Sequence, residues 1–115
     1  MTISVNKMIP ISQPSITQKE IDYVTDAIKS GWVSSLGKYI NKFEEKFADY
    51  CNTKYALTTS NGTTALHLTL VALGITSNDE VIIPDLTFVA TGNAVKYIGA
   101  NVVAVDIDED TLCIS

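Results

Sequence analysis

One short segment of the sequence combines hydroxyl, amide and glycine residues in an order suited to binding an anion. Ser60, Asn61 and Gly62 precede Thr63 and Thr64, at the start of an apolar run of helical length. The amides of Gly62, Thr63 and Thr64 would point out of the helix start, where the helix dipole favours a phosphate. Gly62 would also let the backbone turn sharply and approach a ligand without a Cβ in the way. The segment has neither a P-loop lysine nor a GxGxxG motif, so an ordinary capped helix start is the alternative.

Three other groups of residues are candidates for chemistry. Phe88 follows an apolar run that ends at Pro84; such an aromatic is usually core, but it can also lie flat on a planar cofactor ring. Asp106 precedes a cluster of carboxylates. A solvated turn is a simpler interpretation of this cluster than a metal site, and we predict no metal. His67 lies within the expected helix, where a packed histidine is the simpler interpretation than a catalytic base.

Apolar periodicity predicts the elements that position these residues. Thr17 and Glu20 have the spacing of a capping box, which predicts a helix that ends before Gly31. Alternation of strands and helices then predicts βαβ units with buried, mainly parallel strands. Ligands of such sheets bind beyond the carboxyl ends of the strands, where the candidate residues fall. The expected strands are 55–59, 81–83 and 102–105, and the other expected helices are 39–51, 63–73 and 88–98.

Composition narrows the class of protein. The chain has 115 residues with 46% apolar and 18% charged residues, which is typical of one globular domain. Its net charge is −5 and all eight basic residues are lysines, so we expect no general binding to nucleic acid. No apolar stretch approaches the ~20 residues of a membrane span, and no signal peptide is evident. Cys51 and Cys113 are isolated, which favours reduced thiols in a cytoplasmic protein.

Several short motifs follow one another along nearly the whole chain, from about residue 9 to residue 111. They are Gln13-Pro14-Ser15, Gly31-Trp32-Val33-Ser34-Ser35, Ser60-Asn61-Gly62-Thr63-Thr64-Ala65-Leu66, Asp79-Glu80-Val81-Ile82-Ile83-Pro84 and Thr87-Phe88-Val89-Ala90-Thr91, with Asp106 after a strand. In this order they resemble the DegT/StrS-type nucleotide-sugar aminotransferases, and this combination is more specific than any single motif.

The resemblance implies an α/β fold: the N-terminal part of the large domain of a fold-type-I, aspartate aminotransferase-like enzyme that uses pyridoxal 5'-phosphate (PLP). That large domain has three layers with a mainly parallel sheet. Residues 1–37 would form an N-terminal arm, a helix and a substrate-side loop, and residues 38–115 the first part of the PLP-binding domain. The implied enzyme is a homodimer with shared active sites. It moves an amino group from glutamate to a 4-keto-6-deoxy sugar nucleotide, for the synthesis of cell-surface polysaccharide sugars.

The resemblance also assigns roles to individual residues. Gly62 and Thr63 would hold the cofactor phosphate, Ser60 and Asn61 would shape that turn, and Phe88 would stack on the pyridine ring. The residues implied to bind the sugar substrate are Trp32, Val33, Ser34, Ser35 and Ser12.

No catalytic residue is expected within this sequence. In the family, the lysine that binds the cofactor covalently follows residue 115, and none of the eight lysines here matches its motif. We therefore expect an N-terminal fragment without aminotransferase turnover by itself. Three alternatives stay open: a related sugar dehydratase, in which histidine replaces that lysine; a non-catalytic binding module; and, least favoured because the glycine fingerprint is missing, a small Rossmann-like nucleotide binder.

Overall fold

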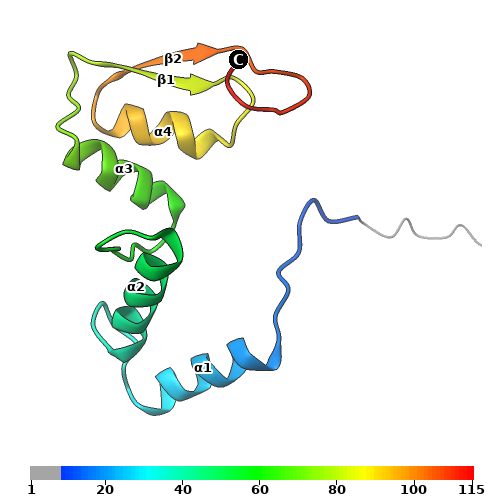
Figure 1. Cartoon of the computed structure of the whole chain (residues 1–115), viewed down its shortest axis with the longest axis vertical. Coiled ribbons are helices and arrows are strands. Elements are labelled where there is room, and N and C mark those ends of the chain that lie inside the picture. The colour runs from blue at the N-terminus through cyan, green and yellow to red at the C-terminus, as the bar shows by residue number, and fades with distance from the viewer. Residues whose placement is uncertain (1–8) are drawn as a thin grey trace, which may run out of the picture.

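The computed structural model describes residues 9–115, and residues 1–8 of the expected arm lie outside the described part. Helices and strands follow one another along the chain from the first helix to a small C-terminal sheet (Figure 1). The elements are α1 (Gln18–Lys29), α2 (Lys38–Cys51), α3 (Gly62–Ala72), β1 (Glu80–Pro84), α4 (Val89–Tyr97) and β2 (Asn101–Val105).

The two strands form the parallel βαβ unit that the sequence predicts. Val81 pairs with Val102 and Ile83 with Ala104, and α4 makes the crossover that a parallel pair requires. The core of this unit is formed by Ile83, Val95 and Ala100. The α/β fold with a parallel sheet is therefore confirmed.

Only one face of the sheet is covered in the described part of the chain. Figure 1 shows α4 lying below the two strands, with α3 beyond it. His67 of α3 meets the ring of Tyr97 of α4 edge-on, with 5.7 Å between the ring centroids. Ile82 points away from these helices and is 61% exposed. The strands are thus buried, as expected, on the face that α4 covers, whereas their other face is exposed.

The strand expected at residues 55–59 is not present, and this prediction is wrong. The segment has no regular secondary structure, and the sheet of residues 9–115 contains β1 and β2 alone. A strand needs a neighbour for its backbone groups, and no such neighbour lies beside this segment. Instead, the Thr58 amide donates to the Glu44 carboxylate of α2 at 2.8 Å. The β-forming residues of this segment therefore form an irregular connection between α2 and α3.

The N-terminal helices lie apart from the sheet. The predicted capping box at the start of α1 is confirmed, since the Thr17 amide donates to Glu20 at 2.7 Å and the Lys19 amide donates to the Thr17 hydroxyl at 3.3 Å. The Cα radius of gyration is 19.5 Å, whereas a compact chain of this length would have about 13 Å. Within residues 9–115, no helix has both the length and the apolar character needed to cross a membrane.

Candidate functional site

The start of α3 is held by a reciprocal cap. The Asn61 side-chain oxygen accepts from the Thr64 amide at 3.0 Å, and the Thr64 hydroxyl accepts from the Asn61 amide at 3.3 Å. The Thr64 amide is therefore occupied, and our prediction that it is free for a ligand is wrong. The amides of Gly62 and Thr63 have no acceptor among the described residues, so two donors remain at this helix end.

Ser60 belongs to the same small polar network. Its hydroxyl accepts from the Asn61 side-chain amide at 3.3 Å and lies 3.4 Å from the Thr64 hydroxyl. Thr59 supports the turn from the other side, because its hydroxyl donates to the Asn61 carbonyl at 3.0 Å. These contacts fix the shape of the turn without using the two free amides.

Gly62 is not required by the fold of this chain. Its φ lies outside the left-handed region, and a Cβ added there would meet no atom within 4 Å. The sharp-turn argument for this glycine is therefore wrong, because any residue can adopt its backbone conformation. The other argument, that a glycine leaves room for a ligand to approach the two free amides, stays a prediction.

An open groove of about 550 Å³ lies where the starts of α3 and α4 face each other. Three of the predicted cofactor residues, Gly62, Thr63 and Phe88, line this groove together. In the sequence, 24 residues separate Thr63 from Phe88. That aromatic, Phe88, is 79% exposed, so its ring is available to a ligand. The lining residues are Gly62, Thr63, Ala65, Leu66, Thr69, Phe88, Ala90 and Thr91.

The groove is apolar with hydroxyl groups and contains no charged side chain. An anion bound there would be stabilised by the amides and the dipole of α3 rather than by a lysine. Thr69 and Thr91 were missed by sequence reasoning. Thr91 belongs to the motif of residues 87–91 but was given no role there, and Thr69 lies outside every quoted motif, with only its helical spacing from Ala65 as a signal.

The residues predicted to bind the sugar lie elsewhere. The connector between α1 and α2 carries Trp32 to Ser35, at the opposite end of α2 from α3 (Figure 1). Within it, the Ser34 hydroxyl accepts from the Leu36 amide at 3.5 Å. Ser12 is exposed in the arm that precedes α1. The structure therefore does not bring these residues to the groove within one chain, and their role stays a prediction.

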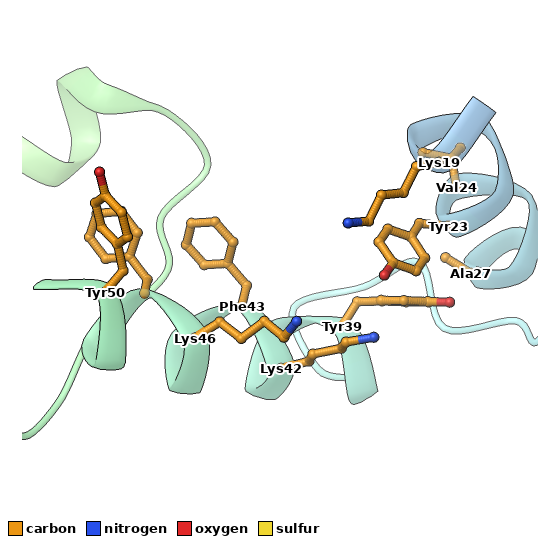
Figure 2. A pocket seen from close by; sticks show the side chains of 10 residues that line it. Lys19, Tyr23, Val24, Ala27, Tyr39, Lys42, Phe43, Lys46 and Tyr50 are labelled. Carbon is orange, nitrogen blue, oxygen red and sulfur yellow. The ribbon is translucent and has the colours of Figure 1, made fainter. Parts of the chain in front are cut away.

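A second hollow, of about 510 Å³, lies between α1 and α2 (Figure 2). Its walls are aromatic: the rings of Tyr23 and Tyr39 are 5.5 Å apart, and Lys42 Nζ lies 4.8 Å from the Tyr23 ring centroid. None of the predicted site residues lines it. The hollow is formed by the uncovered apolar faces of two amphipathic helices.

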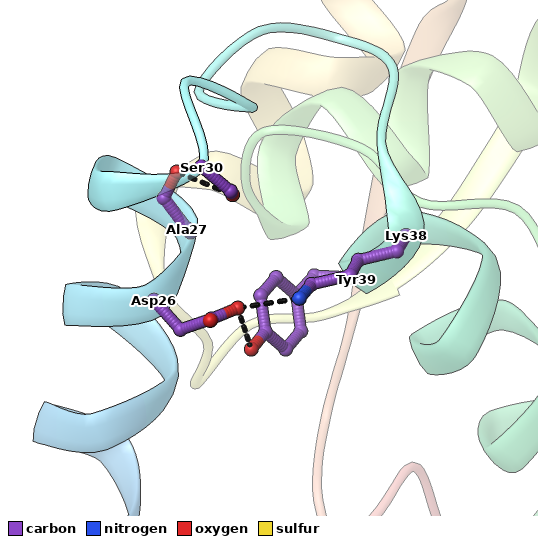
Figure 3. A network of polar contacts seen from close by, with 5 residues as sticks. All are labelled: Asp26, Ala27, Ser30, Lys38 and Tyr39. Carbon is purple, nitrogen blue, oxygen red and sulfur yellow. Dashed lines mark hydrogen bonds and ion pairs between the residues drawn. The ribbon is translucent and has the colours of Figure 1, made fainter.

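One carboxylate joins these two helices (Figure 3). Asp26 of α1 accepts from Lys38 Nζ at 2.6 Å and from the Tyr39 hydroxyl at 2.7 Å, both at the start of α2. These two hydrogen bonds, that of Lys38 first, hold the pKa of Asp26 below its ordinary value. The junction next to the Trp32–Ser35 segment is therefore fixed by polar contacts rather than by buried apolar area.

The carboxylates after β2 form a turn, as predicted. Asp108 accepts from the Asp110 amide at 3.1 Å and from the Thr111 amide at 2.8 Å. The hydrogen bond from the Thr111 amide is the largest cause of a lowered pKa at Asp108. Across residues 9–115, no three side chains of the metal-ligating types are grouped closely enough to hold an ion.

Comparison with known proteins identifies the class to which this arrangement belongs. Residues 14–115 match the DegT/DnrJ/EryC1/StrS aminotransferase family, so the chain belongs to that family. It is 55% identical over 105 residues to GDP-perosamine synthase from Escherichia coli O157:H7, a match covering 91% of this chain and 29% of the relative.

Solved structures give the same fold. An aminotransferase from Psychrobacter cryohalolentis superposes with a TM-score of 0.80 at 42% identity, covering 89% of this chain and 26% of that one. The GDP-4-keto-6-deoxy-D-mannose-3-dehydratase of E. coli, solved with bound hydrated PLP, superposes with a TM-score of 0.78 at 29% identity. This match covers 92% of this chain and 28% of the dehydratase chain. The chain thus spans less than a third of the length of these proteins.

Proposed function

We propose that this chain provides the cofactor-phosphate and ring-stacking part of a PLP-dependent nucleotide-sugar aminotransferase. The observation that carries the proposal is that Gly62, Thr63 and Phe88 line one groove. Two free amides at a helix start suit a phosphate, and an exposed aromatic face suits a conjugated ring. The name of the perosamine synthase relative supports the same class of reaction.

The residues present fit the cofactor in its two distinct parts. The amides of Gly62 and Thr63 would hold the phosphate, while Ser60 and Asn61 keep the turn in place. Phe88 would lie against the pyridine ring. When bound, PLP supplies an electron sink and a carrier for an amino group, which no protein side chain offers.

The sugar-binding residues suggest how the site is completed. Trp32, Val33, Ser34, Ser35 and Ser12 lie away from the groove of their own chain, so we propose that they serve the groove of a partner in a homodimer. In this proposal residues 1–37 form a substrate-side unit and residues 38–115 belong to the cofactor-binding domain. The substrates would be glutamate and a 4-keto-6-deoxy sugar nucleotide, used in the cytoplasm to make a polysaccharide sugar.

Amino transfer also needs a lysine at the cofactor, and the groove contains none. We therefore propose that the 115-residue chain has no turnover by itself. Incubation with glutamate, PLP and a keto-sugar nucleotide, followed by mass spectrometry of the nucleotide sugars, tests this, and an amino-sugar product would contradict it.

Replacing Gly62 by alanine tests the proposed phosphate site. Pyridoxamine 5'-phosphate is a suitable probe because it has no aldehyde that could react with surface lysines, and its fluorescence reports binding. We expect Gly62→Ala to weaken binding by at least about tenfold, since the new methyl group obstructs charge-assisted hydrogen bonds. The melting temperature should stay the same or rise, because alanine fits this helical position without contact.

Gly92→Ala is the matched control. Gly92 lies in α4 outside the groove lining, and a Cβ there would make an ordinary 3.7 Å contact with Ile83. Its binding of the probe should equal that of the unchanged chain. Equal affinities for Gly62→Ala and Gly92→Ala, or no binding by the unchanged chain at millimolar probe, would refute the proposed site.

A sugar dehydratase is the second candidate, favoured by the likeness to the E. coli dehydratase at a TM-score of 0.78. The same groove would serve both reactions, because both classes hold the phosphate and the ring. The distinction requires the full-length gene product: an aminotransferase gives an amino sugar nucleotide from glutamate, whereas a dehydratase gives a deoxygenated one.

A further inference from the structure

We infer that Thr91, through its hydrogen bond with Thr87, is a positioning residue that holds Phe88 at the wall of the groove. The two hydroxyl oxygens are 2.9 Å apart, and the bridge between them spans Phe88. The inference rests on the proposed function, because the proposed function supplies the cofactor ring against which Phe88 would stack.

Among residues 9–115, no other side chain forms a hydrogen bond at the start of α4. Phe88 itself occupies the N-cap position, with φ −68° and ψ 138°, and its side chain cannot accept a hydrogen bond from the helix amides. Phe88 is 79% exposed, so packing restrains its side chain little. The remaining local contact is the Thr91 amide donating to the Phe88 carbonyl at 3.0 Å. The hydroxyl bridge is therefore the side-chain contact that ties the residue before Phe88 to the first turn of α4.

Thr91 is placed to transmit this restraint to the groove. It is half-buried and lines the groove together with Phe88, whereas Thr87 is exposed and lies outside the lining. Across the groove, the Asn61–Thr64 capping box stabilises the start of α3. Both helix starts that face the proposed cofactor are thus tied by side-chain hydrogen bonds, one by a conventional cap and the other by a threonine pair. Such preorganisation reduces the entropy lost when a ligand orders the site.

Amide hydrogen exchange of the 115-residue chain tests the restraint without any ligand. Thr91→Val keeps the side-chain shape and removes the hydroxyl, so the protection factor of the residue 91 amide, which donates to the Phe88 carbonyl, should fall about fivefold, as for one lost hydrogen bond. Thr91→Ser, unlike Thr91→Val, keeps a hydroxyl at this position, so its exchange should be as slow as in the unchanged chain. Thr87→Val should match Thr91→Val, and the double variant should be no faster than either, because all three lose the same bond.

Thr69→Val is the matched control in the same groove. The Thr69 hydroxyl donates to the Ala65 carbonyl at 2.9 Å within α3 and does not touch α4. Its removal should leave exchange in α4 unchanged. Unchanged exchange in Thr91→Val, or failure of Thr91→Ser to restore it, would overturn the inference.

The near-ultraviolet circular dichroism of bound pyridoxamine 5'-phosphate tests the effect on the ring. Thr91→Val should reduce this induced signal and weaken binding by about threefold to tenfold, and Thr91→Ser should recover both. Faster exchange with an unchanged signal and affinity would overturn the positioning role. Failure of the proposed function gives a different pattern: the unchanged chain then binds no probe, while the exchange experiment still decides whether the threonine pair fixes Phe88.

Discussion

Asn61 contributes to the cap of α3 and borders the proposed phosphate site. Its side-chain oxygen takes the Thr64 amide at 3.0 Å, while the next two amides in the chain, those of Gly62 and Thr63, stay free. The cap and the proposed anion site therefore share one turn but use different donors. Because the donors differ, a substitution can alter one function and leave the other in place.

Replacing Asn61 by aspartate should separate the two functions. Aspartate caps a helix as well as asparagine and also suits the helix dipole, so we expect an unchanged or slightly higher melting temperature. The added negative charge beside the free amides should weaken binding of pyridoxamine 5'-phosphate by at least about tenfold at low salt, and by less at high salt. Asn61→Ser, a neutral cap, is the control. If both variants bind the probe equally, the phosphate does not sit at this turn.

Sequence patterns at the level of residues predicted those residues of the groove that follow from local rules. Gly62 and Thr63 stand out because free amides are a property of any helix start, and Phe88 because it follows a strand. The Thr64 amide was misjudged because its partner depends on the side-chain conformation of Asn61. Thr91 was missed because threonines at helical spacing are common, and only the observed hydroxyl contact distinguishes this pair.

At the level of elements, the junction of α1 and α2 depends on a carboxylate, so acid should loosen it. The Lys38 ammonium, and then the Tyr39 hydroxyl, hold the pKa of Asp26 below its ordinary value of about 4. A carboxyl whose pKa is lowered by folding stabilises the folded state at pH values above its ordinary pKa. This stabilisation is lost as the pH falls through the pKa of the folded state. We expect the fluorescence of Trp32, the single tryptophan, to change below about pH 4 as the junction opens.

Asp26→Asn should show the opened junction already at neutral pH, with little further change on acidification. Asp22→Asn is the matched control, because Asp22 accepts from Gln18 within α1 and does not touch α2. An acid transition in Asp26→Asn that equals that of the unchanged chain would show that another group controls the junction.

The helices were predictable from the sequence because their hydrogen bonds are local. Their observed ends lie within about two residues of those expected from caps and glycines. The strands were predictable only where the chain itself provides a neighbour, as β1 and β2 do for each other. Residues 55–59 have strand-forming side chains but no neighbour, and pairing between distant segments is not encoded in a local pattern.

At the level of the whole molecule, little apolar surface is buried. The buried apolar residues of the described chain are Ala48, Ile83, Ala94, Val95 and Ala100, and Val95 has the largest side chain that is fully buried. The radius of gyration of 19.5 Å agrees with this, since a compact chain would have about 13 Å. Buried apolar area is the main term that offsets the loss of chain entropy on folding. The described residues by themselves therefore provide a small stabilising core.

The 115-residue chain should accordingly melt over a broad range and associate in solution, because exposed apolar faces are covered by self-association. Light scattering coupled to size exclusion, together with calorimetry, measures both properties. Ile82→Thr should reduce association without loss of secondary structure, because Ile82 is 61% exposed on the open sheet face and threonine keeps the strand preference. Association that is unaffected by Ile82→Thr would place the contact on another surface, such as the aromatic hollow between α1 and α2. A monodisperse monomer with a sharp two-state melt would contradict the prediction altogether, and would favour an independently folding binding module over part of a larger enzyme.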